Sequence, residues 1–273
     1  MATSTGRDAL RVQAQRDIPH DDVRYARDKV AAAIRFAGKP VLHARVRLSR
    51  LGDPALARPA LVQANVDVDG RLVRAQVARA SMREAVDEAH DRLRDQLQRA
   101  AGNWEAIRGG RPRAGPHEWR HGSIPTHRPP HFPREPETRQ VVRHKVFSLS
   151  RMTLDEAAFD MDMLDYDFHL FTEDGSGVDS VLYRTDGLMP FRLVQARPRP
   201  DRVHFGATPV TVSAAPAPVL DTDQAARRLE VTGWPFVFFR DAGTGHACVI
   251  YHRYDGHYGV ITQAADEPAP SGQ

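Results

Sequence analysis

The stretch "DYDFHLFTEDGSGVDSVLY" at residues 165–183 decides how the back half of the chain folds, because "GWPFVFFRDAGTGHACVIY" at 233–251 repeats its pattern. Residues 154–184 align without a gap with residues 222–252, at a constant offset of 68. Nine aligned pairs are identical: Asp155/Asp223, Ala157/Ala225, Ala158/Ala226, Phe168/Phe236, Phe171/Phe239, Gly175/Gly243, Gly177/Gly245, Val181/Val249 and Tyr183/Tyr251. Each copy is typical of an aromatic strand, a glycine turn and a second strand that ends in tyrosine.

A short helix is predicted before each of these hairpins. Thr153 with Glu156, and Asp221 with Gln224, have the spacing of a capping box at a helix N-terminus. A helix-plus-hairpin module of this size is too apolar and too small to bury its own face. We therefore expect the two copies to pair with each other through the aromatic residues of their strands, which are Phe168, Phe171, Tyr183, Phe236, Phe239 and Tyr251.

The front of the chain has a different pattern of strands and helices. Residues 9–18 alternate apolar and polar side chains and predict a strand that ends at Pro19, followed by a helix with Asp21 or Asp22 as its N-cap. Three strands are predicted at 42–51, 60–70 and 71–80, with a hairpin turn at Asp69-Gly70. A second helix begins at Ser81, where Glu84 completes another capping box.

This order predicts the overall organisation of the chain. One strand, one helix, three strands and one helix make a β-α-β-β-β-α, two-layer α+β domain over residues 1–104, with both helices on one face of the sheet. Residues 105–140 are crowded with Pro, Arg and His and indicate an extended linker. The two α+β modules follow at 141–196 and 197–263, and residues 264–273 are expected to be a disordered tail.

Charge is distributed unevenly along the chain. Lys and Arg minus Asp and Glu give +6 for residues 1–104 and +5 for 105–145, but −5 for 146–200 and −3 for 201–273. A basic front is what a phosphate-binding surface needs, although an ordinary solvated surface remains an alternative. Exposed aromatic residues are scarce in the front, which favours structured RNA over stacked single strands.

Charge and predicted facing select arginines that could contact phosphate. These are Arg24, Arg27, Arg35, Arg45, Arg47, Arg83 and Arg94.

Catalysis and metal binding have little support in the sequence. Spacing indicates no Ser, His and Asp constellation, and Cys248 lies in an apolar run without an adjacent basic activator. The linker histidines His117, His121, His127 and His131 could bind zinc, but no cysteine accompanies them and spacer residues are the simpler interpretation. We expect no catalytic residue, no metal and no cofactor.

The expected location is the cytoplasm. The N-terminal "MATSTGRDALR" lacks the hydrophobic region of a secretory signal, and no run is long enough to cross a membrane. A single cysteine also agrees with a reducing compartment.

Both ends of the chain carry motifs of a known family. "SMREAVDEAHDRLRDQL" at 81–97, "VVRHKVFSLSRMTLDEAAFDMDMLDYDFHLF" at 141–171 and "VIYHRYDGHYGVI" at 249–261 resemble the long form of the ribosome hibernation promoting factors. In the first motif the family pattern of Met, Ala, Asp, Asp-Lys-Leu and Gln-Leu is filled by Met82, Ala85, Asp87, Asp91, Arg92, Leu93, Gln96 and Leu97.

The resemblance implies a non-enzymatic factor that binds rRNA of the small ribosomal subunit. Its front domain would lie in the channel for messenger and transfer RNA and block the aminoacyl and peptidyl sites in stressed or dormant cells. Lys29, Arg92 and Arg99 match basic positions of the family and are expected to contact rRNA. A second family lysine is replaced by Ala32, so no contact is expected from that position.

The doubled C-terminal module departs from the family pattern. In the usual long form one C-terminal domain pairs with the same domain of a second chain and joins two ribosomes. Here we expect the two copies to pair within one chain, without a homodimer. Two alternatives stay open at this point: a DNA- or RNA-binding regulator with a C-terminal dimerisation or ligand module, and a hydrolase built on the back modules.

Overall fold

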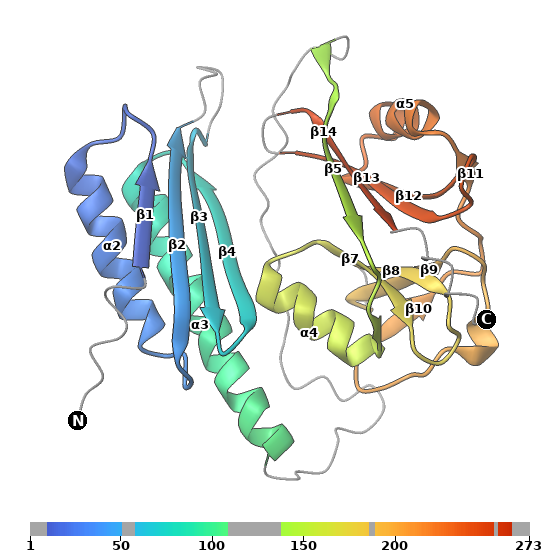
Figure 1. Cartoon of the computed structure of the whole chain (residues 1–273), viewed down its shortest axis with the longest axis horizontal. Coiled ribbons are helices and arrows are strands. Elements are labelled where there is room, and N and C mark those ends of the chain that lie inside the picture. The colour runs from blue at the N-terminus through green and yellow to red at the C-terminus, as the bar shows by residue number, and fades with distance from the viewer. Residues whose placement is uncertain (1–9, 51–57, 109–137, 186–188, 254–255, 264–273) are drawn as a thin grey trace, which may run out of the picture. The chain divides into compact units, whose positions relative to one another are not determined.

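The computed structural model (Figure 1) describes residues 10–50, 58–108, 138–185, 189–253 and 256–263. The chain divides into two compact units: the first contains residues 10–108 and Phe159–Asp167, and the second contains residues 138–158 and 168–263 among those described. In these described ranges, no helix is long and apolar enough to cross a membrane.

The first unit is a four-stranded sheet with two helices packed against it. Its elements in chain order are β1 (Leu10–Ala14), α2 (His20–Ile34), β2 (Val41–Arg50), β3 (Ala60–Val68), β4 (Arg71–Arg79) and α3 (Met82–Arg108). The strand order is β1-β2-β3-β4, with β1 parallel to β2 and the other neighbours antiparallel. The α+β fold class and the β-α-β-β-β-α order predicted from the sequence are confirmed.

The core of this unit lies between the sheet and its helices (Figure 1). Alternate residues of β2, such as Ala44, Val46 and Leu48, are buried, as are Leu93 and Leu97 of α3. Because strand side chains alternate between faces, this pattern leaves the other face of the sheet to polar residues. The hairpin between β3 and β4 turns at Asp69 and Gly70, with positive φ values of 54° and 82°. A tight hairpin turn with two positive φ values favours an Asp-Gly pair.

Two boundaries differ from the sequence prediction. The first strand ends at Ala14, because a turn in which the Ile18 amide donates to the Gln15 carbonyl separates it from α2. That helix has Pro19 in the N-cap position with no side-chain cap, and Asp21 lies in its first turn instead. The Ser81–Glu84 capping box at the start of α3 is present as predicted.

The second unit contains two five-stranded sheets. The first sheet has the order β10-β9-β8-β7-β6, and the second has the order β11-β12-β13-β14-β5. The strands of the first are β6 (Arg151–Met152), β7 (Phe168–Glu173), β8 (Asp179–Arg184), β9 (Phe191–Gln195) and β10 (Val210–Val212). Those of the second are β5 (Val141–Phe147), β11 (Val219–Leu220), β12 (Phe236–Asp241), β13 (Ala247–His252) and β14 (Tyr258–Gln263).

Each copy also has one helix with the predicted cap. Helix α4 (Leu154–Leu164) begins after Thr153, whose hydroxyl accepts from the Glu156 amide while Glu156 accepts from the Thr153 amide. Helix α5 (Thr222–Thr232) begins with the same reciprocal arrangement of Asp221 and Gln224. The two copies therefore share both their caps and their hairpins.

The two copies exchange their first strands. β5 belongs to the first copy in the sequence but pairs in parallel with β14 of the second, and β10 at the start of the second copy pairs in parallel with β9 of the first. At the repeat offset of 68, β10 is the counterpart of β5. The sequence boundary between 141–196 and 197–263 therefore does not separate the two sheets.

An apolar cluster joins the two sheets. Phe168 and Val181 of one sheet lie with Phe238 and Val249 of the other. The Phe168 ring lies 4.5 Å from the Phe236 ring and 5.8 Å from the Tyr251 ring, and the Tyr183 ring lies 5.4 Å from that of Phe236.

Phe171 and Phe239 are placed differently from the other four aromatic residues. Phe239 is fully buried in a separate cluster with Ala225 and Leu229 of α5. Phe171, equally buried, is three residues from Phe168 and so lies on the opposite face of β7. The sequence prediction that both lie between the copies is wrong. Each is three residues from the phenylalanine that faces the other sheet, and so its side chain points to the opposite face of its strand.

Phe168→Ala tests how much the sheet-to-sheet packing stabilises the second unit. Phe168 is 6% exposed and contacts two rings across the interface, so its truncation should lower the free energy of unfolding by about 3–5 kcal/mol. Phe205→Ala is the matched control, because that ring is 49% exposed and should change stability by less than about 0.5 kcal/mol. Denaturant unfolding measures both; equal effects would contradict the packing role.

Candidate functional site

Lys29 of α2 is held by residues on both helices of the first unit. Its Nζ lies 2.6 Å from Oδ1 of Asp87 on α3, and the Tyr25 hydroxyl donates to the same oxygen at 2.7 Å. The ammonium also lies 5.3 Å from the centre of the Tyr25 ring. Asp87 therefore fixes the position of a lysine that remains about one-third exposed.

Arg83 forms a second contact across the same helix pair. Its Nε lies 3.3 Å from Oδ1 of Asp22, and its guanidinium lies 5.1 Å from the centre of the Tyr25 ring. Each helix thus supplies one cation and one carboxylate. Tyr25, between the two cations, was not identified from the sequence, because only the packing of α2 on α3 brings it there.

Hydrogen bonding keeps Lys29 and Asp87 charged. The bond to Asp87, followed by the contact with Tyr25, raises the pKa of Lys29. The bonds from Lys29 and then Tyr25 lower the pKa of Asp87. Both directions favour the charged forms, so the pair persists through neutral pH.

Most of the other predicted basic residues on the helices also lie beside acidic groups. Arg24 pairs with Asp21 at 2.7 Å, and Arg92 pairs with Glu88 at 2.9 Å. Arg94 lies between Asp91 and Asp95, and the Nε of Arg99 donates to the Asp95 carbonyl at 3.3 Å.

The predicted residues without an ion pair to any described residue share a different setting. Arg27, Arg35, Arg45 and Arg47 are all exposed. The structure therefore divides the predicted set into cations held by a neighbouring polar group and exposed guanidinium groups, at α2 and on β2, with no ion pair to a described residue.

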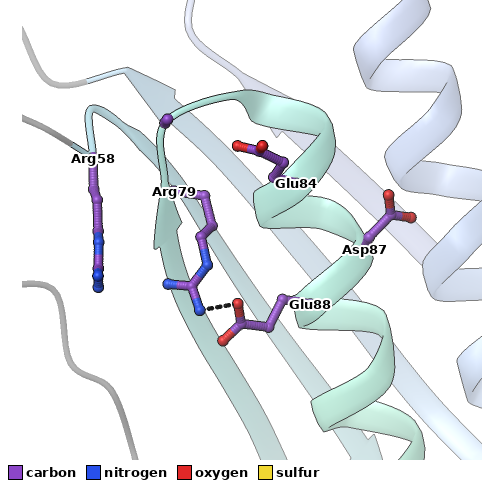
Figure 2. Close-up of a pocket in the computed structure, with 6 residues that line it drawn as sticks. Arg58, Arg79, Glu84, Asp87 and Glu88 are labelled. Carbon is purple, nitrogen blue, oxygen red and sulfur yellow. Dashed lines mark ion pairs between the residues drawn. The ribbon is translucent and has the colours of Figure 1, made fainter.

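A shallow surface hollow lies beside the Lys29 pair. Figure 2 shows its lining, which comes from the segment before β3, the end of β4 and the first turns of α3: Arg58, Arg79, Ala80, Glu84, Asp87 and Glu88. Arg79 forms an ion pair with Glu88 within it. Three carboxylates against two guanidinium groups make the hollow a poor site for a phosphate.

Two carboxylates of the first copy hold the connection between the copies. Asp155 accepts hydrogen bonds from the backbone amides of Ala207 and Thr208, at 3.0 and 2.8 Å, and from the Thr208 hydroxyl. Glu173, which is fully buried, accepts from the His204 amide at 3.1 Å and from two amides of its own turn.

The hydrogen bonds decide the charge of Glu173. Burial by itself would raise its pKa, but the bonds from Ser176, Gly175 and His204 together outweigh burial and lower it. In the second copy the counterpart Asp241 accepts only from Gly243 and Thr244 in its own turn, among the contacts of described residues. The copies have thus diverged where the connection passes, and sequence spacing gave no sign of this.

The single cysteine, Cys248, is buried, and burial raises the pKa of its thiol to about 11. At neutral pH the unreactive thiol form predominates. Within the described ranges no three His, Cys, Asp or Glu side chains are grouped to hold a metal ion. The four linker histidines lie outside the described residues.

Comparison with known proteins places the chain in a family. Residues 14–104 match the family described as sigma 54 modulation protein/S30EA ribosomal protein, and residues 136–188 and 210–260 each match its C-terminal domain. These ranges cover more than half of the chain and include both repeat copies.

Named relatives are similar over most of the chain. The "dormancy associated translation inhibitor" of two Mycobacterium tuberculosis strains, CDC 1551/Oshkosh and H37Rv, is 35% identical over 230 residues, which is 82% of this chain and 77% of the relative. The N-terminal domain of Thermus thermophilus Protein Y is 30% identical, with a TM-score of 0.27, over 32% of this chain and 92% of that one. The chain therefore belongs to the S30EA ribosomal protein family, as a long-form hibernation promoting factor that carries two copies of the C-terminal domain.

Proposed function

We propose that this protein is a ribosome hibernation factor that inhibits translation in stressed or dormant cells. Its front domain binds the small subunit in the channel for messenger and transfer RNA and blocks the aminoacyl and peptidyl sites. The observation that carries this proposal is the 35% identity, over most of the chain, to a protein named as a dormancy associated translation inhibitor. Binding to ribosomes places the protein in the cytoplasm and requires neither a cofactor nor catalysis.

The rRNA contacts begin at the helices of the first unit. Lys29, Arg92 and Arg99 match the family's basic positions. The other predicted arginines near the helices extend this surface: Arg24, Arg27, Arg35, Arg83 and Arg94. Carboxylates such as Asp87 hold the side chains extended and charged before binding, which lowers the conformational entropy lost when a phosphate is bound. A phosphate can then accept from the hydrogens that face solvent, and arginine can do so with two parallel bonds.

The two C-terminal copies pair with each other within one chain. Three features support this: the aromatic contact between Phe168 and Phe236, the exchange of β5 and β10, and the connection held by Asp155 and Glu173. A copy that already has its partner offers no face to a second chain. The factor therefore silences single ribosomes and does not join them in pairs.

Charge removal on the helices tests ribosome binding. The triple variant Lys29→Gln, Arg92→Gln, Arg99→Gln should still fold but bind small subunits more weakly, with a salt dependence of log K shallower by about 2–3. Cosedimentation over a series of salt concentrations measures this. A matched triple variant in the second unit, Arg192→Gln, Arg197→Gln, Arg227→Gln, should keep the wild-type slope. If wild-type protein stays at the top of the gradient, the ribosomal function is wrong and a nucleic-acid-binding regulator is favoured.

The oligomeric state tests pairing within the chain. Sedimentation equilibrium should give the mass of one chain, 30.5 kDa, at micromolar concentrations. Ribosomes saturated with the protein should sediment as single particles, because no free C-terminal face remains. A protein dimer that is lost on deletion of residues 138–273, or a peak of paired ribosomes, would refute this arrangement.

A further inference from the structure

One face of the first unit's sheet points away from α2 and α3 (Figure 1). Two rows of side chains run across all four strands on this face. In the first row Arg11 lies opposite Arg45, Arg45 opposite Asn65, and Asn65 opposite Arg74. In the second row Gln13 lies opposite Arg47, Arg47 opposite Gln63, and Gln63 opposite Gln76. We call these eight residues the arginine–amide face.

This face contains four arginines, four amides and no carboxylate. Arg11 and Arg45 are direct neighbours on adjacent strands, an arrangement of like charges that lowers stability. Within the sheet, the acidic residue on this side of β3 is Asp67, in the adjoining row, where its Oδ1 accepts from the Gly70 amide in the hairpin turn. Outside the sheet, Oδ2 of Asp165 accepts from the backbone amide of Gln76 at 2.9 Å, at the β4 end of the second row. The positive charge of the two rows is therefore not neutralised within the sheet.

The amides position the guanidinium groups without cancelling their charge. Arg45 donates from Nε and Nη2 to Oε1 of Gln13, at 3.1 and 2.6 Å. Gln63 donates from Nε2 to Oε1 of Gln76 at 3.1 Å, and Arg74 donates to the same oxygen. On the helical side of the domain, Lys29, Arg24, Arg83 and Arg92 have carboxylate partners, so the two faces differ in the groups that hold their cations and not in net charge alone.

The composition of the face selects its ligand. Rows of guanidinium groups bind phosphates through paired hydrogen bonds, and amides donate to and accept from ribose hydroxyls. The two rows themselves contain no aromatic side chain, and at their β4 end the Tyr166 ring lies 5.5 Å from the Arg74 guanidinium. The arginines and amides of the rows therefore offer bases no ring on which to stack. Three strand spacings make each row about 14 Å long. These properties fit the sugar-phosphate backbone of structured RNA.

We propose that the arginine–amide face is a second RNA-binding surface, on the side of the front domain opposite to Lys29, Arg92 and Arg99. The proposal rests on the ribosomal function proposed above and adds to it that the domain is held between two RNA surfaces. It assigns Arg11 and the amides Gln13 and Gln63 to RNA binding, in addition to Arg45 and Arg47. The unfavourable arginine pair in the free protein is then relieved when phosphates bind.

The test compares two variants of the full chain on purified small subunits. In the sheet variant Arg11, Arg45 and Arg47 are changed to Gln; in the helix variant Lys29 and Arg99 are changed to Gln. Hydroxyl-radical footprinting of the rRNA should show two separate groups of protected nucleotides in the wild-type complex. The sheet variant should lose one group and the helix variant the other, and the sheet variant should lower the salt slope by about 2–3.

Several outcomes would overturn the proposal. These are a wild-type footprint on one continuous RNA surface, loss of the same nucleotides in both variants, or an unchanged salt slope for the sheet variant. Equal weakening by the variant Arg192→Gln, Arg197→Gln, Arg227→Gln would show an effect of net charge alone. If wild-type protein gives no footprint at all, the ribosomal function itself fails, which is a distinguishable result.

Thermal unfolding separates binding from folding. Because the sheet variant removes like charges from adjacent strands, its melting temperature should equal or exceed that of the wild type. A structural role for these arginines would lower it. Weaker RNA binding with undiminished stability is therefore the result that supports the proposal, and loss of both would contradict it.

Discussion

Neither sheet of the second unit can bury its inward apolar face alone, and this constraint shapes the back half of the molecule. The two sheets bury these faces against each other. Phe168 contacts Phe236 and Tyr251, and Val181 and Val249 lie in the same apolar cluster. In a protein with one such module the missing half must come from another molecule. Here the second sheet belongs to the same chain. The copies differ at Glu173 and Asp241, since Glu173 accepts from the His204 amide of the connection and Asp241 accepts within its own turn.

The first unit is subject to a different constraint, because it must stay folded while it carries an excess of positive charge. On the helices the excess is moderated by carboxylates from the neighbouring helix, as with Lys29 and Asp87. On the open face of the sheet, amides take their place, and Gln13 holds Arg45 without neutralising it. The same domain thus presents cations in two chemical settings. Both leave hydrogens of the basic groups free to meet an anion.

The fold could be predicted from the sequence where the signals were local and had a clear physical cause. Alternation in β2, the Asp69-Gly70 turn and the three capping boxes each involve residues close together in the chain, and all are present. Features that depend on distant residues were not predictable. The exchange of β5 and β10 pairs each strand with a partner from the other copy, and no local sequence signal specifies that partner. The cross-helix pairing of Lys29 with Asp87 likewise needs the packing of α2 on α3. The facing of Phe171 and Phe239 could have been predicted, because residues three apart on a strand point to opposite sides.

The exchanged strands also impose an order on folding during synthesis. β5 leaves the ribosome before the rest of the second unit, yet its partner β14 begins only at Tyr258, close to the end of the described chain. Until β14 is synthesised, β5 lacks its partner strand, and the second sheet is incomplete. β5 also carries two exposed valines, Val142 and Val146. A nascent chain therefore carries its basic front domain, already complete, for the whole time needed to translate the remainder. Under the function proposed above, the half proposed to bind RNA would be complete before the half proposed to prevent self-association.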